Sequence, residues 1–228
     1  MRTHWDRLLE LVPDLEGGRV LDVGSGKGGF LVDAASKGAW VNGLEISDAY
    51  IAESRKKAEE HGVTFDVAKA MAEDMPFPDG IFDLVNMSEL IEHVQDPLAV
   101  LREVRRVLKR GGHAYMSVPN RFGFKDQHFH LYFVNWLPRS FADAYISVFG
   151  AHKNYADTSA GLQRLSDMHY YTYPAIRRLL LELGFDVADI REMRIGRLPA
   201  FKRVLAVILY PLARSVYFDS FHLLLKKR

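Results

Sequence analysis

Short apolar runs alternate with amphipathic stretches along the first half of the chain. Each apolar run is typical of a buried strand, and each stretch that follows has the period of a helix packed on a sheet. The predicted strands cover residues 19–23, 41–45, 64–68, 82–87 and 113–118. The predicted helices cover residues 5–11, 28–36, 47–62 and 97–108, and the basic and glycine residues of 109–112 are expected to close the last one. Alternating strands and helices with right-handed crossovers predict an α/β fold with a doubly wound, mostly parallel sheet.

The alternation stops after residue 118 and resumes near Tyr173. Residues 120–167 are rich in aromatic residues and have no predicted strand, although residues 138–149 have a helical period. So long a segment within a compact domain usually has a function or helices of its own. We therefore expect an inserted helical lid over residues 120–168. A helix over 173–184, a strand from Phe185 and a last strand over 220–227 complete a predicted seven-stranded sheet.

A strongly apolar segment, residues 198–219, precedes the last predicted strand. Lys202, Arg203 and Arg214 interrupt it, and Pro211 breaks it. The uninterrupted run 204–213 is shorter than the roughly 20 residues that a membrane span needs. We expect one or two helices here, which either pack inside the protein or lie on a membrane surface.

The composition fits a single α/β domain and not a nucleic-acid-binding protein with a strongly basic surface. The 228 residues suffice for one domain over 1–228, and a net charge of +1 makes a nucleic-acid partner unexpected. The basic residues between Arg102 and Arg110 have helical spacing and are interpreted as a solvated helix face. There is no cysteine, which excludes disulfides and cysteine-based zinc sites. The first residues lack the apolar core of a signal peptide, so we expect a cytoplasmic protein, peripheral to the membrane at most. The oligomeric state does not follow from the sequence.

The loop after the first predicted strand has the pattern of a ligand-binding site. Residues 19–30 read R-V-L-D-V-G-S-G-K-G-G-F, so the strand stops at glycines and turns directly into a helix. Glycines let the backbone approach a ligand closely, and a helix N-terminus offers unpaired N–H groups. Gly24, Gly26 and Gly29 also satisfy the dinucleotide pattern G-x-G-x-x-G, and Glu45 after the second strand suits a ribose diol.

Asp22, within the first predicted strand, distinguishes between two classes of ligand. A carboxylate here would repel the pyrophosphate of a dinucleotide and attract a cation. S-adenosyl-L-methionine (SAM) carries both an ammonium and a sulfonium group. The run L-D-V-G-S-G-K-G resembles motif I of the class I SAM-dependent methyltransferases. An NAD-dependent oxidoreductase with the same loop and a non-catalytic, regulatory SAM-binding protein are the alternatives.

Four further stretches resemble the same family, so that the resemblance covers residues 20 to 120. They are residues 43–47, 72–78, 82–88 and 108–112. The resemblance implies SAM as the cofactor, with Glu45 on the ribose hydroxyls, Ile46 against adenine, 72–78 on the adenine edge and Ser88 beside the methionine moiety. The cofactor-binding residues that it implies are Asp22, Gly24, Ser25, Gly26, Glu45, Ile46, Ala72, Glu73 and Ser88.

An E-x-x-E-H run after the fourth predicted strand adds a candidate metal site. Glu89, Glu92 and His93 share a face if they lie on a helical turn, and such a set can bind Mg²⁺, Mn²⁺ or Zn²⁺. The run resembles two metal-assisted groups, the O-methyltransferases of ubiquinone biosynthesis and the small-RNA 2′-O-methyltransferases. Both groups add a downstream histidine, which the resemblance places at His169, with His128 and His130 as competitors. Without a metal, His93 would be a catalytic base or line the substrate pocket.

The aromatic residues of the expected lid bear on the acceptor. They either fill a small core of the lid or contact an apolar substrate. They are Phe122, Phe124, Phe129, Tyr132, Phe133, Trp136, Phe141, Tyr145 and Phe149. The sequence predicts O-methylation of a small apolar or aromatic acceptor, such as a phenol, a quinone precursor or a lipid-like molecule. The balanced charge disfavours RNA, and a glycan stays open.

Overall fold

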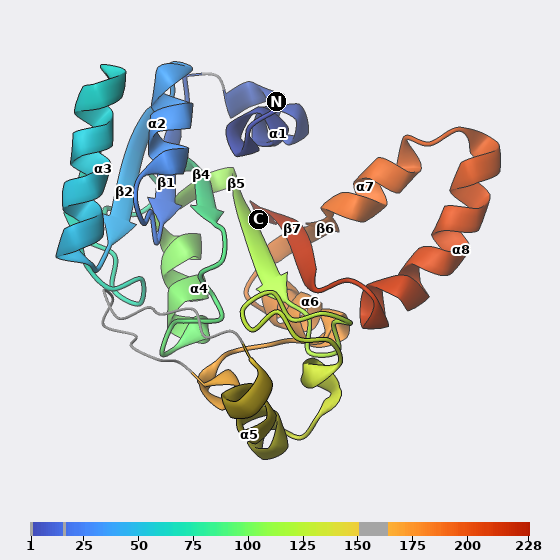
Figure 1. The fold of residues 1–228 in the computed structure, drawn as a ribbon. Helices are drawn as coiled ribbons and strands as arrows, with labels where there is room; N and C mark the ends of the chain where they lie inside the picture. The colour runs from blue at the N-terminus through green and yellow to red at the C-terminus, as the bar shows by residue number, and fades with distance from the viewer. Residues whose placement is uncertain (1, 16, 151–163) are drawn as a thin grey trace.

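The computed structural model describes residues 2–15, 17–150 and 164–228. The described residues form a seven-stranded sheet with the order β3-β2-β1-β4-β5-β7-β6 (Figure 1). Its strands are β1 (Arg19–Val23), β2 (Trp40–Glu45), β3 (Asp66–Lys69), β4 (Phe82–Met87), β5 (Leu108–Pro119), β6 (Phe185–Asp189) and β7 (Ser220–Lys227). β7 is antiparallel to both of its neighbours, and the other pairs are parallel. The predicted α/β fold with a mostly parallel sheet is confirmed.

Helices cover both faces of this sheet. The helices in the described ranges are α1 (His4–Leu11), α2 (Gly29–Ser36), α3 (Asp48–His61), α4 (Pro97–Val107), α5 (Arg139–Phe149), α6 (Tyr173–Glu182), α7 (Ile190–Gly196) and α8 (Ala200–Val216), of which α5 and α8 lie away from the sheet. Leu8 of α1, Leu31 of α2 and Ile190 of α7 belong to the core on one face. Leu101 of α4 and Ile176 of α6 belong to the core on the other face. This two-sided covering is the doubly wound arrangement that the alternation predicts.

The junction between α4 and β5 differs from the sequence-based prediction. The Asp96 carboxylate caps α4 by accepting hydrogen bonds from the backbone N–H groups of Leu98 and Ala99, as its Asp-Pro start indicates. The helix ends at Val107, because Leu108 is already extended and pairs with Phe82 of β4. Residues 109–112 therefore belong to β5 and do not close the helix, so this part of the prediction is wrong.

The chain between β5 and α6 makes a small body beside the main core. Its described part contains α5 and two short 3₁₀ turns, η2 (Val134–Trp136) and η3 (Leu165–Asp167). A separate cluster of buried side chains holds it together: Phe129, Val134, Ala142, Ile146, Leu165 and Met168. Residues 151–163 of the expected lid lie outside the described residues. The segment starts directly after β5, so it lies at the carboxyl end of that strand.

α8 does not pack inside the protein. With α7 it forms an arm that extends away from the sheet (Figure 1). Of the described residues of α8, Tyr210 alone is buried. The alternative in which this apolar segment is a buried packing element is therefore wrong. Among the helices in the described ranges, none is long and apolar enough to cross a membrane.

Candidate functional site

The glycine loop and Glu45 meet at the carboxyl ends of β1 and β2. Gly24, Gly26 and Gly28 have φ angles of 72°, 51° and 75°, which favour glycine. One oxygen of Glu45 accepts a hydrogen bond of 2.8 Å from the backbone N–H of Gly26. Its other oxygen accepts bonds of 2.8 and 2.9 Å from the N–H groups of Ile46 and Ser47. Glu45 thus fixes the shape of the loop, at the end of the sheet where ligands of doubly wound folds bind.

The glycines of the loop have two different functions. A Cβ atom on Gly28 would lie 2.6 Å from the Cβ of Ser54, so this position needs glycine for the close approach of two helices. A Cβ on Gly24 would lie 2.9 Å from a methyl group of Leu90. A Cβ on Gly26 would meet nothing within 4 Å. Gly26 therefore faces open space, which leaves room for a ligand against its backbone.

Asp22 is a buried carboxylate beside this loop. One of its oxygens accepts a hydrogen bond of 2.6 Å from the side-chain amide of Asn86 on β4. Burial raises the pKa of Asp22 to about 7, and the nearby charge of Glu45 acts in the same direction. The hydroxyl of Ser25 is also buried and has no hydrogen-bond partner in the part of the chain that the structure describes. A cationic ligand with polar groups would ionise Asp22 and supply a partner for Ser25, so these residues fit SAM.

Asn86 also belongs to a second group of polar side chains, which come from α1, β4, β5 and β7. The Asn86 carbonyl oxygen accepts a hydrogen bond of 3.1 Å from Ser88, and it lies 3.0 Å from Nε2 of His4. Burial lowers the pKa of His4, which keeps its ring neutral at pH 7. The Tyr115 hydroxyl lies 2.7 Å from Nδ1 of His222, whose pKa burial lowers to about 4. Sequence reasoning missed these residues, since α1 and β7 are distant from the glycine loop along the chain.

Ile46, Ala72 and Glu73 lie around the expected adenine site in different ways. Ile46 is 40% exposed, which leaves its apolar side chain accessible for contact with an aromatic ligand. Ala72 is partly buried and packs against the main core. The Glu73 carboxylate accepts hydrogen bonds of 2.9 and 3.3 Å from the backbone N–H groups of Gln95 and Asp96. Glu73 thereby supports the turn before α4, and its contact with adenine stays a prediction.

Glu92, His93 and His128 form a separate cluster that could hold a metal ion. Ligand atoms of the three lie within 4.8 Å of one another. An oxygen of Glu92 lies 3.6 Å from Nε2 of His128 and 3.9 Å from Nε2 of His93. Glu92 is 1% exposed, and neither of its oxygens has a hydrogen-bond partner among the described residues. A buried carboxylate without a donor is costly, so a cation or a donor from a ligand would stabilise this arrangement.

The orientation of His128 is fixed by residues of the segment after β5. Its Nδ1 lies 3.0 Å from the Tyr170 hydroxyl, which donates a hydrogen bond of 2.8 Å to Asp126. Burial raises the pKa of Tyr170, so that hydroxyl keeps its proton. Because the hydroxyl donates its hydrogen bond to Asp126, it accepts one from Nδ1 of His128, which then carries the ring proton, and Nε2 directs a lone pair toward Glu92. Histidines that bind a metal commonly donate their other ring N–H to a fixed acceptor in this way.

Among the described residues, Glu89 and His169 do not belong to this cluster. Residues 88–94 contain turns instead of a helix, so the expected shared helical face is wrong. Glu89 has a φ angle of 53°, and its backbone N–H donates a hydrogen bond of 2.7 Å to the Ser117 hydroxyl. The backbone N–H of His169 donates to the backbone carbonyl of Glu92 over 3.1 Å. His169 thus supports the turn that carries Glu92 through its backbone.

His128 holds the position that the resemblance gives to His169. In the sequence His128 was a competitor for this place, as was His130, whose φ angle of 58° marks a turn. Only the contact between the segment after β5 and the turn after β4 distinguishes these histidines. No local sequence pattern carries that information.

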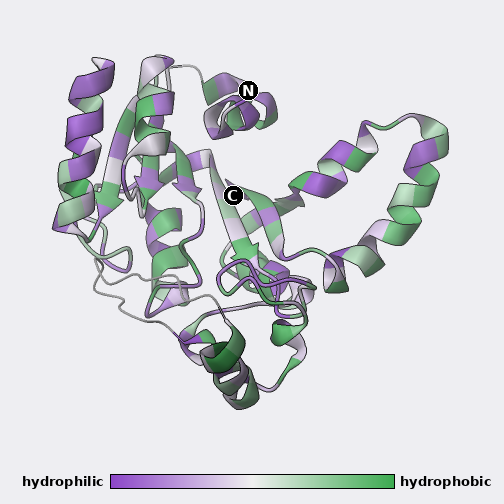
Figure 2. Ribbon diagram, in the orientation of Figure 1, coloured by the Kyte–Doolittle hydropathy of each residue, from purple (hydrophilic) through white to green (hydrophobic). Residues whose placement is uncertain are grey.

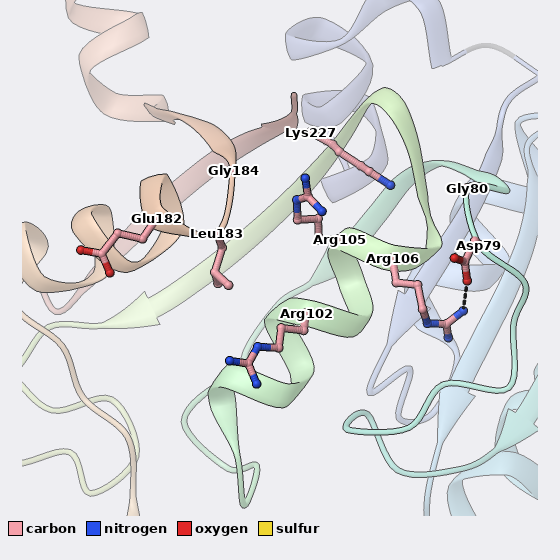
Figure 3. Close-up of a pocket in the computed structure, with 9 residues that line it drawn as sticks. All are labelled: Asp79, Gly80, Arg102, Arg105, Arg106, Glu182, Leu183, Gly184 and Lys227. Atoms are coloured by element: carbon pink, nitrogen blue, oxygen red, sulfur yellow. Dashed lines mark hydrogen bonds and ion pairs between the residues drawn. The ribbon is translucent and has the colours of Figure 1, made fainter.

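A basic hollow lies at the opposite end of the sheet from the glycine loop. It has a volume of about 640 Å³ and lies between α4, the residues before β4, the end of α6 and Lys227 of β7 (Figure 3). Arg102, Arg105, Arg106 and Lys227 line it. Arg106 pairs with Asp79 and Glu103 at 2.7 Å, and Lys227 donates to the backbone carbonyl of Leu108. Two of its four cations thus serve the fold. Arg102, Arg105 and Arg106 lie on α4, whereas Lys109 and Arg110 belong to β5, so the interpretation of the whole basic stretch as one helix face is wrong.

The chain resembles known proteins most clearly in the half that carries the glycine loop. Residues 21–116 match the family described as "Methyltransferase domain". Over 126 residues the chain is 40% identical to a ubiquinone biosynthesis O-methyltransferase of Pseudomonas aeruginosa and 38% identical to one of Pseudomonas fluorescens. Each match covers 53% of this chain and 51% of the relative. The chain therefore spans about half the length of the curated relatives it matches.

Solved structures share the fold over nearly the whole chain. A SAM-dependent methyltransferase of Mesorhizobium loti has a TM-score of 0.62 and 18% identity, and the match covers 98% of this chain and 97% of that one. One of Methanosarcina mazei has a TM-score of 0.61 and 21% identity, with 95% and 96% covered. A [4+2]-cyclase has a TM-score of 0.59 and 19% identity, with 99% and 83% covered. Since a cyclase shares it, the fold alone does not decide the reaction.

Proposed function

We propose that this chain is a class I SAM-dependent methyltransferase, and that it transfers the methyl group of SAM to a hydroxyl group of a small apolar or aromatic acceptor. The observation that carries this proposal is the pair of buried carboxylates, Asp22 and Glu45, on either side of the glycine loop. A pyrophosphate would be repelled by Asp22, whereas Glu45 suits a ribose in either cofactor. This argues against the NAD-dependent alternative.

The loop residues account for the binding of SAM by charge and hydrogen bonding. Asp22 would attract the cationic part of the cofactor, and its raised pKa means that binding also ionises it. Glu45 accepts three backbone hydrogen bonds. An ionised carboxylate has about four acceptor positions, so one stays available for a ribose hydroxyl. Ser25 and the N–H groups of the loop would complete the contacts.

Methyl transfer to a hydroxyl group requires alignment and the removal of one proton. The hydroxyl oxygen attacks the methyl carbon, the carbon–sulfur bond breaks, and the acceptor loses its proton. Without a bound metal, His93 is the candidate base, since its partly exposed ring lies beside Glu92 after the strand that ends at the cofactor site. The segment after β5 would exclude water from the transfer as a lid, which is a function common to such segments.

A divalent metal fits the cluster of Glu92, His93 and His128. The fit rests on the buried, unpartnered carboxylate of Glu92 within the described chain and on the lone pair that His128 directs at it. One carboxylate and two imidazoles suit Zn²⁺ or Mn²⁺ better than Mg²⁺, which prefers oxygen ligands. A bound ion would supply a positive charge that lowers the pKa of an acceptor hydroxyl. Tyr170 and Asp126 would hold His128 in place for it.

The acceptor class is supported by the aromatic surface of the segment after β5. Its exposed aromatic residues are Phe122, Tyr132, Phe133, Trp136, Phe141, Tyr145 and Phe149. Phe129 is the aromatic member of the segment's own buried cluster, so most of these rings do not fill that core. The names of the curated relatives, ubiquinone biosynthesis O-methyltransferases, also favour a quinone precursor as the acceptor.

A turnover assay tests this function. The purified chain would be given SAM and a set of catechols and phenols with and without prenyl tails, and the release of S-adenosylhomocysteine measured. Turnover should rise with an acceptor, and His93→Ala should lower it about 10²–10⁴-fold. His113→Ala, in the middle of β5, is the matched control and should keep full rate. SAM binding without turnover on any acceptor would instead support the regulatory, non-catalytic alternative.

A further inference from the structure

α8 presents a continuous apolar face to the solvent. Seven large apolar residues that are 43 to 76% exposed make up this face: Phe201, Val204, Leu205, Ile208, Leu209, Leu212 and Val216. At 100° per residue these positions fall within an arc of about 140°. Figure 2 shows hydrophobic residues along most of this helix. An arc of this width normally faces a protein core, so on α8 it requires another covering.

The opposite side of α8 makes polar contacts with the rest of the protein. These contacts hold the apolar face of α8 toward the solvent. The Tyr210 hydroxyl donates a hydrogen bond of 2.7 Å to Asp189. The Arg214 guanidinium lies 3.3 Å from the same carboxylate and 3.4 Å from the centre of the Tyr173 ring. The side-chain amide of Asn120 donates to the backbone carbonyls of Arg214 and Ser215. Turning the apolar face inward would break all of these contacts.

The arm is strongly basic, although the whole chain is nearly neutral. Residues 190–216 contain six basic residues and one acidic residue, against a net charge of +1 for the chain. Arg194, Arg197, Lys202 and Arg203 are exposed at the end of the arm where α7 meets α8. Exposed cations beside an exposed apolar face match the pattern of a helix that lies in the interface of an anionic membrane.

We propose that α8 docks along the surface of a bilayer that contains anionic lipids, with its apolar face among the acyl chains. Lys202 and Arg203 would lie at the level of the headgroups, where an anionic membrane neutralises them. A second copy of the chain is the weaker candidate for this face, because α8 contains no acidic residue that could pair with these cations.

The apolar face also leads toward the proposed acceptor site. Tyr217, directly after α8, stacks on Phe124 of the segment after β5 with ring centres 6.2 Å apart. Phe124 in turn contacts Tyr132 and Phe133. A lipid-borne acceptor would therefore meet a continuous aromatic surface between the membrane and the end of β5. This route rests on the proposed function, whereas the docking of α8 does not.

Vesicle sedimentation tests the docking. The full chain would be mixed with vesicles of phosphatidylcholine alone or with added phosphatidylglycerol, and we expect it to pellet with the second kind. Ile208→Glu should lower the partition coefficient about tenfold or more, because it places a charge in the acyl region. Lys202→Glu should lower it at least about fivefold, and only on the anionic vesicles. Trp40→Glu, a change at an equally exposed apolar residue on β2, should have no effect.

Three results would overturn the proposal. The protein could stay in the supernatant with both kinds of vesicle, or Ile208→Glu could pellet like the unchanged chain. Alternatively, analytical ultracentrifugation could show a dimer that Ile208→Glu dissociates while no vesicle binds, which would make the face an interface between copies. Calorimetry with SAM on the same variants separates this from the proposed function, since Ile208→Glu should bind SAM like the unchanged chain.

Discussion

The side-chain amide of Asn86 on β4 donates a hydrogen bond of 2.6 Å to the buried carboxylate of Asp22 on β1, across the point where the strand order reverses. This bond favours the ionised form of Asp22, but burial outweighs it and raises the pKa to about 7. A buried carboxylate poised between its two forms is a site where a cationic ligand changes the protonation of the protein.

The affinity for SAM should therefore depend on pH through Asp22. Between its ordinary pKa of 3.8 and about 7, the folded protein holds a proton that the unfolded chain has lost. The free energy of unfolding of the ligand-free protein should thus fall as the pH rises through this window and level off above it. SAM affinity should rise toward pH 7, about tenfold per pH unit, and then stay constant. Calorimetry and thermal unfolding measure both slopes.

Asp22→Asn is the control for this pH dependence. It keeps the shape of the side chain and removes the titration, so it should bind SAM weakly at every pH. It should also remove the loss of stability between about pH 4 and pH 7. An unchanged SAM affinity in the intact protein between pH 5 and pH 8 would contradict the role of Asp22 as the partner of a cation.

Glu45 should contribute to SAM affinity both directly and through the loop. Glu45→Ala removes a charged hydrogen bond worth about 1.5–3 kcal/mol, and the bond to Gly26 with it. Calorimetry should show a loss of affinity of roughly ten- to hundredfold. Glu73→Ala is a matched control, because the carboxylate of Glu73 bonds to the turn before α4. If Glu45→Ala binds SAM like the unchanged chain and stays folded, the ribose assignment is wrong.

The metal proposal predicts a particular set of sensitive residues. EDTA should abolish turnover without weakening SAM binding, and Zn²⁺ or Mn²⁺ should restore it. Glu92→Gln and His128→Ala should behave like the chelated protein, whereas His169→Ala should retain metal and rate. Elemental analysis of each variant provides the readout besides activity. Full turnover in a metal-free protein would leave His93 as a plain base and return His128 to a structural position.

The segment after β5 should become more protected when the acceptor binds. Its small core and its exposed aromatic rings fit a lid that closes on an apolar molecule. Hydrogen exchange at the backbone of residues 120–150 and 164–168 should slow with SAM and acceptor together. α3 is an internal reference whose exchange should not change with the acceptor. Equal exchange with and without acceptor would indicate a rigid insertion.

The sequence predicted the sheet well where local patterns decide the structure. β1, β4 and β7 have the predicted bounds, because apolar runs that end at glycine or polar residues fix them. It failed at residues 109–112, where pairing of Leu108 with Phe82 extends β5 instead of capping α4. It was also wrong about the helical face at Glu89. The place of His128 beside Glu92 depends on a tertiary contact between distant segments. The direction in which the apolar face of α8 points also depends on tertiary contacts, so neither could be derived from periodicity.

The most direct test of the account is the transfer of an isotopically labelled methyl group. The chain would be incubated with SAM that carries a trideuterated methyl group and with a prenylated catechol, and the acceptor analysed by mass spectrometry. We expect that one hydroxyl hydrogen is replaced by one trideuterated methyl group, in an amount equal to the S-adenosylhomocysteine released. SAM that binds tightly and stays intact, with no labelled product on any phenolic or lipid-like acceptor, would contradict methyl transfer as the function of this site.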